Sequence, residues 1–204
     1  MSRFIGRENL RKRLAPLEGS TGRTAYDDGI VRIEPDDGEA LAVRPPFGLA
    51  HEARYDEVRV APLLEEIAAD HVVAALLVRL GGYAVGVFEG ERLVASKVGS
   101  RFVKGRHKKG GSSANRFRRR REEQARALVE EAARVAADVL EPWRERVEFA
   151  ALGGDRSAVD AVLAARPDLA WLPERALPRF FTVPEPRQRV LARLPYDLYS
   201  SEVL

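Results

Sequence analysis

The chain has 204 residues, of which 45% are hydrophobic, so it is long enough to bury a substantial core, and its net charge is only +3. It contains no cysteine, which excludes disulfides, thiolate catalysis and cysteine-ligated metals and suits a cytoplasmic protein. The N-terminus lacks the apolar run of a signal peptide, and the longest apolar stretch, Val72 to Val78, is too short to cross a bilayer. The three histidines lie far apart in sequence, so we expect no metal site. Since no apolar stretch could cross a bilayer, we also expect no membrane partner, and we expect no cofactor.

The first 57 residues predict a short helix followed by a hairpin. Residues 3–17 carry Phe4, Leu10 and Leu14, which are available for one apolar side of a helix. The stretches IVRI and ALAV are joined by EPDDGE, whose Asp-Asp-Gly favours a tight turn. We expect residues 1–57 to form an N-terminal arm that packs on a core domain of residues 58–204.

Three successive strands are predicted from residue 71 onward, after a short helix from Leu63 to Ala69. Their sequences are VVAALLVRL, YAVGVFEG and RLVASKVGSRFV. The intervening turns, Gly81-Gly82 and Glu89-Gly90-Glu91, suit antiparallel hairpins. Because the first strand is apolar at nearly every position, we expect it to be central in the sheet and covered on both faces.

Helices and strands alternate after this meander. Apolar residues recur at helical spacing from Ser113 to Leu140, and Pro142 ends that helix. Four further elements are predicted after it: a strand over VEFAAL, a helix over Arg156–Ala165, a strand over Phe180–Val183 and a helix over Arg187–Arg193. The expected fold class is therefore α/β, a mixed sheet with an antiparallel strand meander and a long helix after a basic Gly-Gly loop.

Positive charge is concentrated between Arg101 and Arg121. This segment holds ten Lys or Arg residues, one His and no acidic residue. Because the whole chain carries only +3, subtracting these ten charges leaves −7 for all other residues. So local an excess of cations favours a polyanionic partner.

Two other interpretations of the segment are weaker. Gly105 to Ser112 has the spacing of a phosphate-binding loop, but Gly111 stands where that motif needs its lysine. A purely solvated helix face would explain the charges if they were well placed. Instead the like charges repel along the helix and lie at the unfavourable end of its dipole. Their retention points to a function.

Recognition of RNA explains the segment best. Arg and Lys neutralise phosphates, a helix N-terminus presents N–H groups to an anion, and Gly110 and Gly111 allow close approach of the backbone. Only Phe102 and Phe117 are aromatic nearby, so shape and phosphate recognition of structured RNA is favoured over base stacking. The candidate RNA-binding residues are Lys104, Arg106, His107, Lys108, Lys109, Arg116, Arg118, Arg119, Arg120 and Arg121.

The segment HKKGGSSANRFRRRREEQARALVEEAAR resembles the GGQ region of archaeal and eukaryotic class I peptide-release factors. In that region a basic Gly-Gly-Gln loop leads into a helix that opens Ser-Ala-x-Arg-Phe-x-x-x-Arg. The stretch GGYAVGVFEGERLVASKVGSRFVKGR resembles more closely the actinobacterial branch of the Vms-like release-factor family. The resemblance runs from about Val72 to the C-terminus and implies a fold like the release-factor middle domain.

This resemblance implies hydrolysis of the ester that joins a nascent peptide to tRNA, in termination or in rescue of stalled ribosomes. It implies the ribosome, through its rRNA, and peptidyl-tRNA as partners of a monomeric protein. The loop glutamine of class I release factors positions the attacking water, but Ser112 stands at that position here. In relatives of the Vms type the glutamine stands one or more positions later, where this chain has Ser113, Ala114 and Asn115. The candidate catalytic residues are Gly110, Gly111, Ser112, Ser113 and Asn115. A non-catalytic ribosome- or RNA-binding protein that has lost the glutamine is the alternative.

Overall fold

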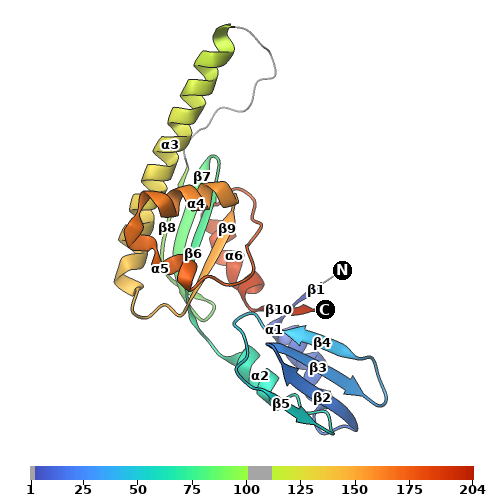
Figure 1. Ribbon diagram of the computed structural model, residues 1–204. Helices are drawn as coiled ribbons and strands as arrows, with labels where there is room; N and C mark the ends of the chain where they lie inside the picture. The colour runs from blue at the N-terminus through green and yellow to red at the C-terminus, as the bar shows by residue number, and fades with distance from the viewer. Residues whose placement is uncertain (1–2, 101–111) are drawn as a thin grey trace. The chain divides into compact units, whose positions relative to one another are not determined.

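The computed structural model describes the backbone of residues 3–100 and 112–204, and all of their side chains except those of residues 112–118. The chain forms two compact units, whose residues can be followed by colour in Figure 1. The first consists of Met1–Asp70 with Leu194–Leu204, and the second of His71–Arg193. The division therefore falls 13 residues later than the boundary expected after residue 57, and the C-terminal segment returns to the first unit.

The first unit is built on a six-stranded antiparallel sheet in the order β1-β10-β4-β3-β2-β5. Its strands are β1 (Arg3–Gly6), β2 (Gly22–Asp27), β3 (Ile30–Pro35), β4 (Leu41–Arg44), β5 (Ala53–Tyr55) and β10 (Ser200–Val203). Helices α1 (Arg7–Leu14) and α2 (Ala61–Ala68) bury Leu10, Leu14 and Leu63 in one cluster with Tyr26 and Ile33 of the strands. Alternate strand residues supply that cluster, as expected for a sheet with one covered face.

Two predictions in this unit are confirmed and one is partly wrong. The hairpin forms as β3 and β4, with Val31 opposite Val43, and the helix predicted from Leu63 forms as α2. Residues 3–17 do not form a single helix. Arg3–Gly6 is a strand because it pairs with Ser200–Val203, and the helix begins only at Arg7.

The second unit is built on a four-stranded mixed sheet in the order β8-β7-β6-β9. The strands are β6 (Val72–Arg79), β7 (Gly82–Glu89), β8 (Arg92–Ser100) and β9 (Phe149–Gly154). The first three form the predicted antiparallel meander, while β9 lies parallel to β6. The interior residues of β6 are all buried, which confirms that it is a central strand covered on both faces.

Helices cover both faces of this sheet (Figure 1). The long helix α3 (Ser112–Leu140) and α4 (Arg156–Ala165) share one buried cluster with β6 and β7. On the opposite face, Leu191 of α6 (Gln188–Leu198) packs over Gly86 of β7. A short helix, α5 (Trp171–Glu174), and three single 3-10 turns, Ala15–Leu17, Glu141–Trp143 and Pro167–Leu169, complete the described elements.

Two predictions near the C-terminus need correction. Phe180–Val183 is not a strand, because Phe181 makes only an isolated parallel bridge to Gly153. The last helix does not end at Arg193 but continues to Leu198, with Pro195 inside it. Asp155 stands at the N-cap of α4, the helix predicted over Arg156–Ala165, and its side chain accepts a hydrogen bond from the Leu80 N–H (3.1 Å).

Candidate functional site

The basic segment joins the end of β8 at Ser100 to the start of α3 at Ser112. Ser112, Ser113, Asn115, Arg116 and Arg118 occupy the first turns of α3, where the side chains lie outside the described set, as does that of Phe117. Seven of the candidate residues lie outside the described part of the chain altogether: Lys104, Arg106, His107, Lys108, Lys109, Gly110 and Gly111.

The described cations of α3 face solvent. Arg119 and Arg120 are exposed and Arg121 is partly exposed. No side chain between residues 119 and 127 is buried, and Leu128 is the first that is. Figure 1 shows this half of the helix continuing past the strands of its sheet. The arginines therefore stand on a stretch of helix that makes no core of its own.

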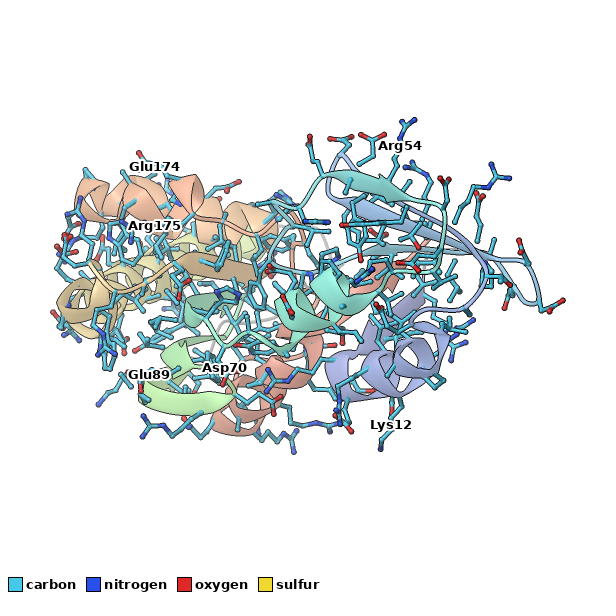
Figure 2. All side chains as sticks on the ribbon, turned by 90° about the horizontal axis from the view of Figure 1, so that it is seen from below. Lys12, Arg54, Asp70, Glu89, Glu174 and Arg175 are labelled. Carbon is cyan, nitrogen blue, oxygen red and sulfur yellow. The ribbon has the colours of Figure 1, made fainter. Side chains whose placement is uncertain are left out.

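The C-terminal half of α3 is packed tightly on the sheet. Leu128, Ala132, Val135, Ala136 and Leu140 are all buried there. The alanines are small, which lets the helix lie close to β6 and β7. After the helix ends, Arg175, which is labelled in Figure 2, donates a hydrogen bond to the carbonyl of Val147 (2.7 Å). This bond fixes the segment between α3 and β9. One half of the helix thus holds the other in place.

A tyrosine links β8, which precedes the basic segment, to the packed half of α3, which follows it. Tyr83 of β7 lies opposite Gly99 of β8, and its hydroxyl donates to Glu131 Oε1 of α3 (3.0 Å). A Cβ atom on Gly99 would lie 2.3 Å from the Tyr83 ring, so the ring occupies the place of the missing side chain. Burial, and then the Glu131 carboxylate, raise the pKa of Tyr83 to about 12, which keeps the hydroxyl protonated as a donor.

No sequence motif distinguishes Tyr83, Gly99 or Glu131 from its neighbours. Tyr83 and Gly99 lie within predicted strands and Glu131 lies within the predicted long helix. A glycine inside a predicted strand often marks a place where another group approaches the backbone closely. Gly99 is such a glycine, but only the pairing of β7 with β8 shows that the approaching group is Tyr83.

The polar pair next to the unit's first strand has a structural role. His71 Nδ1 lies 2.9 Å from Glu148 Oε2, and Glu148 Oε1 accepts from the Val72 N–H (2.9 Å). Burial opposes ionisation of Glu148, but the hydrogen bonds from His71 and Val72 outweigh it and lower the pKa of that carboxyl. The pair joins the start of β6 to the residue before β9.

The described part of the chain has neither a metal-binding cluster nor a membrane-spanning helix. Among residues 3–100 and 112–204, no three His, Asp or Glu side chains gather closely enough to hold a metal ion. Within the same part of the chain, no helix is both long and apolar enough to cross a membrane.

Comparison with known families identifies the family of this chain. Residues 71–204, more than half of the chain, match the family model described as the Actinobacteria/chloroflexi VLRF1 release factor. The chain belongs to this family. Membership confirms the resemblance found from the sequence, and the mixed sheet with its meander and long helix confirms the predicted fold class. It gives this VLRF1 family member a release-factor-like role in translation.

Two solved structures are similar to this VLRF1 family member. One is the archaeal translation termination factor aRF1, at a TM-score of 0.46 and 17% identity, covering 94% of this chain and 54% of that one. The other is named only as an archaeal protein, at a TM-score of 0.41 and 18% identity, covering 86% of this chain and 51% of that one. The chain therefore spans about half the length of the solved structures it matches.

Proposed function

We propose that this protein binds the ribosome and hydrolyses peptidyl-tRNA in termination or in rescue of stalled ribosomes, acting as a monomer in the cytoplasm. The observation that carries the proposal is the basic Gly-Gly segment, which directly precedes the long helix α3 in the sequence of a chain of the release-factor family. The exposed Arg119 and Arg120 support binding of RNA phosphates.

The hydrolytic reaction needs a water near the ester carbonyl and a donor directed at the oxyanion that develops. Backbone N–H groups between Gly110 and Ser113 are our candidates for the donor. Ser112, Ser113 or Asn115 would help to place the water. Gly110 and Gly111 would let the backbone enter a crowded RNA cavity.

A second candidate function has its own supporting observation. Ser112 stands where class I release factors carry the catalytic glutamine, and the next glutamine along the chain is Gln124. A helix rises about 1.5 Å per residue, which puts Gln124 about 18 Å farther along α3 than Ser112. This favours a non-catalytic ribosome-binding protein as the alternative.

The deciding experiment measures peptide release from stalled ribosomal complexes, with free peptidyl-tRNA as the comparison substrate. We expect slow release by the parent protein and none by the Gly110→Ala/Gly111→Ala variant. Ser112→Gln should raise the rate if the class I alignment holds, and Ala114→Gln should do so if the Vms-like alignment holds. If the parent and both glutamine variants bind ribosomes but release no peptide, the hydrolase proposal is wrong and the binding function remains.

A further inference from the structure

One side chain contacts both the strand that precedes the basic segment and the helix that follows it. Gly99 precedes the last residue of β8, and Glu131 lies one turn beyond the first buried residue of α3. Tyr83 touches both, through ring contact with Gly99 and a 3.0 Å hydrogen bond to Glu131. Its side chain is 2% exposed, so water hardly competes for either contact.

The ring contact depends on Gly99 having no side chain. β8 is the outer strand of its sheet, and an aromatic ring that lies across a glycine in an outer strand compensates for the missing side-chain packing. Any larger residue at position 99 would displace the ring, because the position of a Cβ lies 2.4 Å from the Tyr83 hydroxyl. The same displacement would separate that hydroxyl from Glu131.

Helix geometry makes this contact important for the basic segment. From Glu131 back to Ser112, α3 is about 28 Å long. A tilt of only about 2° at Glu131 would therefore move the start of the helix by about 1 Å. A displacement of about 1 Å in a reacting group can lower a catalytic rate about a hundredfold. Between residues 119 and 127 the helix has only exposed and partly buried side chains, so its first fully packed contacts begin at Leu128.

We infer that Tyr83 and Glu131 are positioning residues, which set the angle of α3 and thereby the place of its first residue, Ser112, relative to the peptidyl ester. They contact neither RNA nor the reacting atoms in this assignment. The consequence for the ester rests on the proposed hydrolase function, whereas the consequence for the helix angle does not.

The test uses the full-length chain, whose lack of cysteine lets two introduced cysteines carry the only spin labels. Glu123→Cys on α3 and Asp160→Cys on α4 place both labels on exposed positions of one unit. Tyr83→Phe keeps the ring and removes the donor, Glu131→Ala removes the acceptor, and Glu131→Gln keeps an acceptor oxygen. Asp138→Asn, in an exposed ion pair with Arg134 of the same helix, is the matched control.

We expect Tyr83→Phe and Glu131→Ala to broaden the label-to-label distance distribution, and Glu131→Gln and Asp138→Asn to leave it as narrow as in the parent. In peptide release, the first two variants should lose about tenfold or more in the rate at saturating ribosomes, with half-saturation unchanged. Equally narrow distributions in all variants would overturn the inference, whatever the rates. If Tyr83→Phe fails to fold, the two Glu131 variants decide the question. A parent without release activity would refute the hydrolase proposal and leave the distance test intact.

Discussion

Replacing Arg119 and Arg120 with alanine tests whether α3 binds RNA. Both side chains are exposed on a stretch of α3, residues 119–127, that has no buried side chain, and alanine favours helix, so the variant should fold normally. Each phosphate contact contributes about 0.7–0.9 to the slope of log affinity against log salt concentration. Losing two contacts should flatten that slope by about 1.6. The ratio of parent to variant ribosome affinity should therefore fall about tenfold as the salt concentration rises from roughly 50 to 200 mM.

The assay is ribosome affinity over a salt series. The matched control is Arg134→Ala/Arg144→Ala, which removes the same charge from two exposed arginines that pair with Asp138 and Glu141. We expect the control to keep the slope of the parent. Parallel salt plots for the parent and the Arg119/Arg120 variant would refute the reasoning and reduce this patch to a solvated helix face.

Two further predictions concern stability. Because the pKa of Tyr83 is raised to about 12 from 10.0, the folded chain holds that proton more tightly than the unfolded chain, and its contribution is complete below pH 10. The contribution of Tyr83 to stability should fall by roughly 2 kcal/mol between pH 10 and 12, and urea unfolding of Tyr83→Phe over this range should lack that part of the total loss. Gly154→Ala should cost more than about 2 kcal/mol in the same assay, since φ is +100° and a Cβ would lie 2.1 Å from the Val78 carbonyl oxygen. Gly81→Ala, with φ +110° and open space around it, should cost less; equal losses would contradict the steric part of the reasoning.

The sequence predicted the second unit well where local signals agree. Gly81-Gly82 and the turn around Gly90 separate three apolar runs, and those runs became β6, β7 and β8 in the expected order. The spacing of apolar residues located α3 to within one residue of its start. These elements form from contacts between neighbours in sequence, so their patterns are readable without the fold.

Elements that depend on distant partners were not predictable in this way. Arg3–Gly6 has too few residues to show an alternation, and its strand conformation comes from pairing with Ser200–Val203. Phe180–Val183 has the composition of a strand but finds only one bridge, beside Gly153. For the candidate site, composition located the cations, whereas the contact of Tyr83 with Gly99 and Glu131 required the register of two strands and a helix.

The position of β10 has consequences for making and handling this protein. It lies between β1 and β4, so the sheet of the first unit cannot close until nearly the whole chain has been synthesised. More than 150 residues separate Arg44 from Ser200, which at usual translation speeds is a delay on the order of ten seconds. During that time β1 and β4 each present an unpaired edge, a known risk for aggregation.

The same topology determines which fragments of the protein should express well. A fragment trimmed to residues 71–204, the range of the family match, would retain β10 without either of its neighbours. Ending the fragment at Arg193 removes β10 but cuts α6, which runs from Gln188 to Leu198. We therefore expect fragments that end before residue 200, or that begin after β4, to express less well than the whole chain, because one compact unit is inserted within the other.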